Sequence, residues 1–295
     1  MPEQSIAEIL RRVRRIQIVA RRSVNDLLAG QYRSVFRGRG MEFDEVREYQ
    51  PGDEIRTIDW NVTARTGTPF VKRYSEEREM TVMFVLDVSA SGVFGSGVQS
   101  KLERMAEIAA VLMFSAFRNN DKAGLLLFAN DVVSYFPPRK GRSSLLRLIR
   151  EMITTTPVRQ ETRPDLALQF LNRVQRRRCV VFLISDFLTL PSLRALSVSR
   201  GRHDVIAVSV SDPREQQFPD VGFIRLQDAE TGELIELDTR HPRVRAALQQ
   251  RWRRREDELK ALLQRAGIDR LQISTHEAYA VGLRRFFETR EKRFR

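Results

Sequence analysis

Three oxygen-bearing side chains, Asp87, Ser89 and Ser91, directly follow a short apolar run, Thr81–Leu86. The run is rich in β-branched and aromatic residues, which is typical of a strand buried on both faces of a parallel sheet. The polar residues alternate with small or apolar ones, so in an extended turn their oxygens point the same way. Three hard oxygens at the end of a strand suit a divalent cation such as Mg²⁺. The motif alone does not exclude a loop whose Asp and Ser only satisfy backbone donors.

A second carboxylate, Asp186, ends another buried-strand pattern, Cys179–Ser185. Strand and helix patterns alternate from residue 81 onward, which predicts an α/β fold with a doubly wound, mostly parallel sheet and helices on both faces. In the common strand order of such sheets, the first and fourth strands are neighbours. The run before Asp186 is the fourth, so we expect Asp87 and Asp186 to flank the crevice at the carboxyl edge of the sheet.

The periodicity of apolar residues predicts the elements that position these side chains. Strands are expected at 81–86, 123–128, 132–136, 179–185, 205–210 and 271–274, with a late hairpin at 223–226 and 234–237. Helices are expected at 101–118, 144–153, 164–174, 193–199 and 242–266, with a last one running through 287. An amphipathic helix with arginines on its polar face is expected over residues 5–28.

The chain divides into four expected segments. Residues 1–36 form an amphipathic helix and linker, 37–79 a small β-rich subdomain, 80–240 the α/β domain and 241–295 a helical extension. Glycines and a Pro51-Gly52-Asp53 turn punctuate the second segment, where arginines and carboxylates alternate with apolar residues. We expect bidentate Arg–carboxylate pairs to fix its geometry and the subdomain to dock on the main sheet. It contains no visible nucleophile–base pair.

The net charge of +13 over 295 residues is concentrated at the two ends. Residues 1–40 hold nine arginines and three acids, and residues 237–295 hold sixteen basic and eight acidic residues. Such ends suit an acidic partner, an anionic membrane surface or nucleic acid, but solvated helix faces are the favoured interpretation. Nucleic acid is not expected, because no aromatic-interleaved basic motif is present. Peripheral membrane contact is conceivable and not expected.

Cysteine usage and hydropathy bear on the compartment. The single Cys179 excludes an internal disulfide and lies in an apolar run, as a buried structural thiol would. No run approaches the roughly 18 apolar residues of a membrane-spanning helix, and arginines interrupt the N-terminal region. We therefore expect a cytoplasmic protein.

The motif residues resemble the metal-ion-dependent adhesion site of von Willebrand factor type A (vWA) domains. In that family an Asp and two Ser of the first loop, a Thr of the second and an Asp of the third surround Mg²⁺ or Mn²⁺. The resemblance implies that Asp87, Ser89, Ser91, Thr162 and Asp186 are the metal ligands. Thr162 matches because Ala167-Leu168 follows at the usual spacing, although Thr154, Thr155 and Thr156 lie nearby. Gly92 stands where the family commonly has Met.

A wider resemblance covers nearly the whole chain. It is carried by Gly38–Phe43 (G-x-G-x-E-F), Arg47, Tyr49, Gly52-Asp53, Arg56, Ile58-Asp59-Trp60, Ala64-Arg65, Val71-Lys72, Asp212-Pro213, Glu215, Pro219, Asp228, Thr231-Gly232-Glu233 and Phe286-Phe287 with Arg290. These residues are similar to the signature of the bacterial domain of unknown function 58 family, which places such a segment ahead of a vWA domain. Members typically accompany MoxR-type AAA+ ATPases, so the resemblance implies such a partner.

Two carboxylates and three hydroxyls leave Mg²⁺ short of its six ligands, so a carboxylate of another protein would complete the site. The leading expectation is a non-enzymatic module that captures an exposed Asp or Glu of a partner through the metal and works with an ATPase chaperone. A metal-dependent hydrolase is the runner-up, but the chain has no phosphate-binding G-x-x-x-x-G-K-[ST] loop and no base near the motif. A basic scaffold for nucleic acid or anionic lipid is the third alternative.

Overall fold

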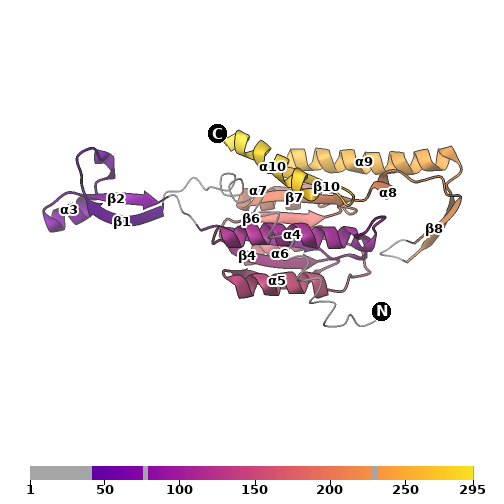
Figure 1. Ribbon diagram of the computed structural model, residues 1–295, viewed down its shortest axis with the longest axis horizontal. Helices are drawn as coiled ribbons and strands as arrows, with labels where there is room; N and C mark the ends of the chain where they lie inside the picture. Colours follow the sequence, from indigo (N-terminus) through magenta and orange to yellow (C-terminus); the bar gives the residue numbers. More distant parts are fainter. Residues whose placement is uncertain (1–41, 76–78, 228–231, 295) are drawn as a thin grey trace.

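Six strands form the central sheet in the order β10-β7-β6-β3-β4-β5 (Figure 1). The computed structural model describes residues 42–75, 79–227 and 232–294, so the helix expected over 5–28 lies outside the described residues. The strands are β3 (Thr81–Asp87), β4 (Lys122–Phe128), β5 (Val132–Arg139), β6 (Val180–Ser185), β7 (Asp204–Ser211) and β10 (Asp269–Ser274). Only the β4–β5 pair in this sheet is antiparallel. The predicted doubly wound topology is confirmed, with β3 beside the fourth strand, β6.

Helices cover both faces of this sheet (Figure 1). They are α4 (Lys101–Arg118), α5 (Arg142–Thr154), α6 (Pro164–Val174), α7 (Leu193–Arg202), the short α8 (Pro213–Gln216), α9 (Pro242–Ala266) and α10 (Tyr279–Phe294). Alternate residues of β3 face opposite ways: Phe84 packs in a core with α4, α5 and α10, and Val85 in a core with α6, α7 and α9. This two-sided burial explains why β3 is a continuous apolar run instead of an alternating one.

The C-terminal segment belongs to the sheet domain. β10 pairs in parallel with β7, and Leu283 and Phe287 of α10 are fully buried in the core that contains α4. Within the described residues, β10 and α10 therefore pack on the same sheet as β3 to β7, across the expected boundary at residue 240. The extended segment that the sequence predicts at 271–274 is confirmed as part of β10. Its place in the sheet is not predictable from local pattern, because β10 pairs with residues about sixty positions earlier in the chain.

In the part of the chain that the structure describes, two hairpins lie outside the central sheet. β8 (Phe223–Gln227) and β9 (Leu234–Asp238) form the expected late hairpin. β1 (Glu42–Glu48) and β2 (Phe70–Ser75) form another, with η2 (Ile55–Thr57) and α3 (Trp60–Thr66) between them. Arg47 donates to both carboxylate oxygens of Asp53, at 2.9 and 2.7 Å, which is the bidentate pairing expected there. Figure 1 shows this unit apart from the helices and strands of the sheet domain, so the expected docking on the sheet is not seen.

Within the described residues, no helix combines the length and the hydropathy that a membrane-spanning segment requires.

Candidate metal centre

Asp87 ends β3 at the middle of the sheet, paired in register with Phe128 of β4. Asp87 is 2% exposed, and both oxygens of its carboxylate accept hydrogen bonds. The Ser89 amide donates to Oδ1 at 2.9 Å, and the Ser185 hydroxyl donates to Oδ2 at 2.7 Å. The first bond turns the chain sharply after the strand, and the second ties Asp87 to the end of β6. Burial, reinforced by the charge of Asp186, raises the pKa of Asp87 to about 6.

Ser89 and Ser91 present their hydroxyls together. The two Oγ atoms lie 2.9 Å apart, and both residues are buried. Ser89 is extended and precedes the short 3₁₀ helix η3 (Ala90–Val93), which contains Ser91. The prediction that the two serine oxygens point the same way is therefore confirmed, although a 3₁₀ turn achieves it and not a fully extended one.

Asp186 follows β6 directly, and the next residue, Phe187, has a positive φ of 52°. This left-handed turn brings the Leu188 amide to Asp186 Oδ1 at 3.1 Å. The Ser91 hydroxyl hydrogen-bonds Asp186, and the negative charge of Asp186 acts on Asp87. Four of the five predicted ligands, from two adjacent strand ends, thus form one buried cluster, which we name the Asp–Ser cluster (Asp87, Ser89, Ser91 and Asp186).

Thr162 lies in the loop between α5 and α6, which is pinned to the same edge of the sheet. Val158 in this loop bonds the backbones of Val88 and Ala90, and the Arg163 amide donates to the Ala129 carbonyl at 2.8 Å. Thr162 is 4% exposed. The hydroxyls of the rival residues Thr154 and Thr155 instead donate to carbonyls of α5. Burial and loop position favour Thr162 among these threonines.

Sequence reasoning missed Lys101, the first residue of α4. Its side chain is fully buried, and its Nζ lies 2.6 Å from Asp186 Oδ2 and 2.6 Å from Glu215 Oε1. Burial opposes the charge of Lys101, but Asp186 and Glu215 outweigh it and raise the pKa of the ammonium. The same ion pair overcomes the effect of burial on Asp186 and lowers the pKa of its carboxyl. Lys101 was detectable, because it is in helical register with buried Met105 and Ile108 on the apolar stripe.

Two more charged residues, Glu215 and Arg255, interact with Lys101 or with its carboxylate partners. Glu215 belongs to α8, where it forms a capping box with Asp212. Arg255 of α9 lies close enough to Asp186 and Glu215 for their charges to act on it, although burial is the larger effect and lowers its pKa. Lys101 is 85 positions from Asp186 and 114 from Glu215, and Arg255 is 69 positions from Asp186, so no local pattern predicts these contacts.

The donor set fits a hard divalent cation. The Asp–Ser cluster and Thr162 offer carboxylate and hydroxyl oxygens, the ligand type that Mg²⁺ and Mn²⁺ take. No group of three or more His, Cys, Asp or Glu side chains in the described residues is arranged to hold a metal, and the Asp–Ser cluster itself offers two carboxylates, with hydroxyls as its other oxygens. Both carboxylate oxygens of Asp87 and of Asp186 already accept hydrogen bonds from protein groups, so an ion would share these oxygens with the present donors. Lys101 is the one charged group that competes directly for these oxygens among the contacts described above.

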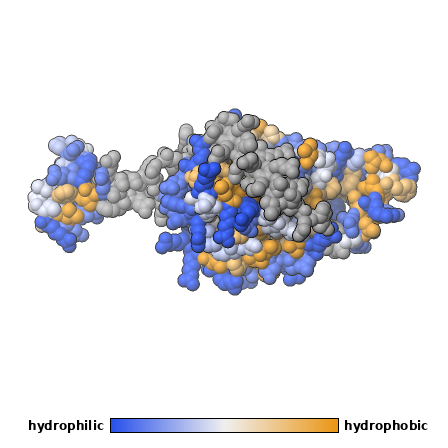
Figure 2. All heavy atoms as spheres, turned by 60° about the horizontal axis from the view of Figure 1, so that its bottom comes forward, coloured by the Kyte–Doolittle hydropathy of each residue, from blue (hydrophilic) through white to orange (hydrophobic). Residues whose placement is uncertain are grey.

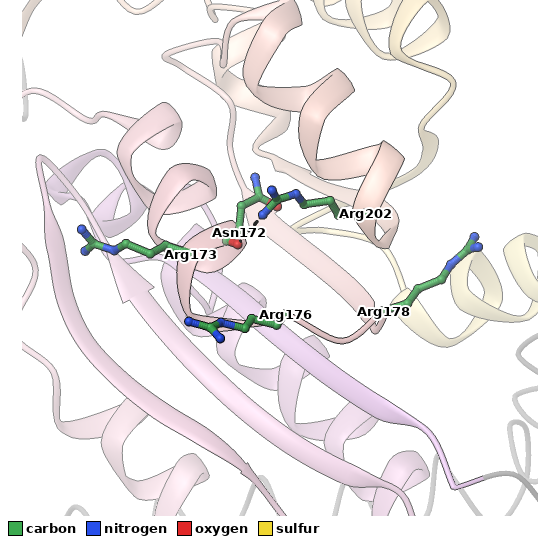
Figure 3. A pocket seen from close by; sticks show the side chains of 5 residues that line it. All are labelled: Asn172, Arg173, Arg176, Arg178 and Arg202. Carbon is green, nitrogen blue, oxygen red and sulfur yellow. Dashed lines mark hydrogen bonds between the residues drawn. The ribbon is translucent and has the colours of Figure 1, made fainter.

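A surface pocket of about 610 Å³ lies at another place, near the ends of α6 and α7. It is lined by Asn172, Arg173, Arg176, Arg178 and Arg202. Figure 3 shows that Arg202 reaches toward Asn172 while Arg178 points away from the others, so the guanidinium groups do not converge on one point. Arg173 and Arg202 lie in last helical turns, where positive charge complements the helix dipole.

The fold of this chain is similar to those of several solved structures. BatB of Bacteroides thetaiotaomicron is 16% identical with a TM-score of 0.47, covering 72% of this chain and 99% of that one. A vWA protein of Catenulispora acidiphila is 10% identical with a TM-score of 0.43, covering 76% and 44%. Scores this low carry no functional argument, and the architecture rests on the strand order described above.

Sequence comparison is decisive for the family. An uncharacterized protein of Mycobacterium tuberculosis is 35% identical over 223 residues, which are 75% of this chain and 70% of the relative. The family model described as "Protein of unknown function DUF58" matches residues 45–258. The match spans the β1–β2 unit, the sheet from β3 to β7 and most of α9, and so includes every residue of the Asp–Ser cluster. The chain belongs to the DUF58 family.

Proposed function

We propose that this protein is a non-enzymatic interaction module that captures an acidic side chain of a partner protein at the Asp–Ser cluster. Asp87, Ser89, Ser91, Thr162 and Asp186 would hold Mg²⁺ or Mn²⁺, which when bound supplies an open coordination position for the partner's carboxylate. The observation that carries the proposal is the meeting of two carboxylates and two hydroxyls at the adjacent ends of β3 and β6.

The surroundings of the cluster favour binding over hydrolysis. Within the described residues, the histidines contact groups outside the cluster: His203 bonds Cys179, His276 bonds Ser96, and His241 lies beside Asp238. Burial also raises the pKa of Cys179 to about 12, which leaves it a poor nucleophile. A hydrolase needs a positioned base or nucleophile near the ion, and the described contacts supply none.

Exposed apolar side chains surround the same edge of the sheet. Val93 and Phe94 end the loop that follows β3 and contains Ser89 and Ser91. Val98, in the segment before α4, is 92% exposed, and the exposed Leu188 lies two residues after Asp186. Figure 2 also shows apolar residues gathered at the end of the molecule that carries the β8–β9 hairpin, where Phe223 is 73% exposed. Exposed apolar side chains gathered in this way are common at protein-binding surfaces.

The partner that family resemblance suggests is a MoxR-type AAA+ ATPase, and we include it in the proposal. In this scheme the module couples a client or the ATPase itself to chaperone-like assembly or maturation. The acidic side chain that binds would be an Asp or Glu exposed on the partner.

Two measurements test the proposal. Mn²⁺ titration of the purified protein, followed by electron paramagnetic resonance, should show one saturable site that Asp87→Ala removes. Affinity for a purified MoxR-type ATPase should then fall at least about tenfold, or 1.4 kcal/mol, with chelator and in Asp87→Ala. Asp131→Ala is the matched control, because Asp131 lies in the β4–β5 turn, bonds its neighbour's amide and is exposed. Equal affinity in all samples would refute the metal bridge.

A further inference from the structure

Lys101 is a cation built into the candidate metal centre. Its side chain is fully buried, and its ammonium lies between two carboxylates that come from separate elements. A buried ammonium is costly unless it is paired, so Lys101 must keep at least one of these partners in any folded state. The Phe94 ring at the end of η3 also lies near the ammonium, with its centroid 6.0 Å from Nζ.

Asp186 is the carboxylate that Lys101 shares with the cluster. Its Oδ2 accepts from Nζ at 2.6 Å, and its Oδ1 accepts from the Leu188 amide at 3.1 Å. A divalent ion that binds Asp186 directly would stand within a few ångströms of the ammonium. Two cations at such a distance repel strongly in a poorly solvated site. The ion and Lys101 therefore oppose each other at this residue.

Glu215 gives Lys101 a second anchor that lies outside the cluster. Its Oε1 accepts from Nζ, and its Oε2 accepts from the Asp212 amide at 3.2 Å. Asp212 is in turn fixed, because its carboxylate accepts from the Thr275 hydroxyl at 2.7 Å and the Ser96 amide at 3.0 Å. Glu215 is thus fixed through Asp212, which follows β7 and is bonded to Thr275 at the end of β10 and to Ser96 in the loop before α4. Lys101 can release Asp186 and remain paired.

We propose that Lys101 competes with the divalent ion for Asp186, and that ion binding shifts its ammonium onto Glu215 alone. This inference rests on the proposed metal site. The metal-free centre is then a closed state in which Lys101 compensates the charge of Asp186. Ion binding opens it and transfers the change to α8, which carries Glu215, and to Arg255 of α9, on which the charges of Asp186 and Glu215 act. Lys101 therefore sets the metal affinity of the centre without being a ligand.

The test is Mn²⁺ titration of the full chain and of variants that change the competing charge. Lys101→Met keeps a long apolar side chain and removes the charge, and we expect it to bind Mn²⁺ at least about tenfold more tightly than the native protein. Lys101→Arg keeps the charge and should bind no more tightly than the native protein. Lys122→Met is the matched control, because it removes a half-exposed lysine that pairs with Glu79 at the other end of β4, and its affinity should be unchanged.

A second variant changes the affinity in the opposite direction and protects the test against misfolding of Lys101→Met. Glu215→Gln weakens the second anchor, so Lys101 stays on Asp186 and Mn²⁺ affinity should fall several-fold. Circular dichroism and thermal unfolding confirm that each variant is folded.

The outcomes separate this inference from the proposed function. Equal Mn²⁺ affinity in the native protein and Lys101→Met, or unchanged affinity in Glu215→Gln, overturns the competition and leaves the metal site standing. Binding in Lys101→Met alone supports the competition and overturns metal-bridged capture by the native protein. Absence of binding in every folded variant overturns both.

Discussion

Asp87 and Asp186 are the same residue type in one cluster, yet their environments shift their pKa values in opposite directions. Burial and the neighbouring charge of Asp186 raise the pKa of Asp87 to about 6. Burial acts on Asp186 as well, but the adjacent Lys101 ammonium outweighs it and lowers the pKa. Without a bound metal ion, a negative charge on Asp87 has no cationic partner comparable to the one that Lys101 gives Asp186. Asp87 is therefore the residue at which the metal-free fold is least satisfied.

This imbalance predicts how stability depends on pH. A carboxyl whose pKa is raised on folding stabilises the protein while it is protonated, and that contribution is lost as the pH rises through the folded pKa. Asp87→Asn stays neutral, so in chelator it should become more stable than the native protein as the pH rises from about 4 to 7. The difference should approach about 3 kcal/mol, from 1.4 kcal/mol per pKa unit.

Urea unfolding at several pH values measures this difference, and the comparison cancels titrations that both proteins share. Saturating Mg²⁺ should reverse the order, because the ion stabilises only the protein that binds it. A stability difference that does not change between pH 4 and 7 would contradict the assigned environment of Asp87.

At the level of elements, the sequence predicted most of what positions the site, because local periodicity reports burial. The helix at 101–118 has the bounds of α4, and the strand order placed Asp87 next to Asp186. The periodicity of α4 also reports the burial of Lys101, but it does not report the ion pairs of Lys101. Its partners, Asp186 and Glu215, approach it only when β6 and α8 pack against α4, and such tertiary contacts leave no periodic trace. The sequence analysis did not predict helix α3, because this helix has only seven residues and lies within a turn-rich segment.

Two glycines, one in a strand of the sheet and one in a helix, give a prediction about packing. A Cβ added at Gly124 in β4 would lie 2.5 Å from Met83 Sδ and 3.0 Å from the Phe136 carbonyl oxygen. Gly124→Ala should therefore destabilise the protein by about 1–3 kcal/mol, as overpacking does. Gly201 in α7 has open space around its Cβ position, so Gly201→Ala should stabilise by about 0.5–1 kcal/mol through helix propensity.

Chemical denaturation of both variants measures these free energies of unfolding. Similar effects of the same substitution at the two positions would show that β3, β4 and β5 are less closely packed than the structure indicates.

For the whole molecule, the C-terminal segment decides where the domain ends. Its basic residues and its apolar residues lie on different faces of α9: Leu259 and Leu263 are buried against the sheet, while Arg253, Arg254 and Lys260 are exposed. Much of the positive charge of this segment is thus solvated, as its sequence suggested. α10 is also fixed to the sheet, because Arg290 pairs with Asp204 of β7 and with Asp269 of β10.

This integration predicts that the last helix is needed for the stability of the entire sheet domain. Phe287 is fully buried beside Leu283, so Phe287→Ala should cost about 3–5 kcal/mol. Val281, in the same helix, is 70% exposed, and Val281→Ala should change stability by less than about 0.5 kcal/mol. An independent extension would behave differently, because its loss would leave the unfolding of β3 to β7 unchanged. Hydrogen exchange of the β3 amides distinguishes the two cases: their protection should fall in Phe287→Ala and persist in Val281→Ala, and unchanged protection in both would restore the boundary at residue 240.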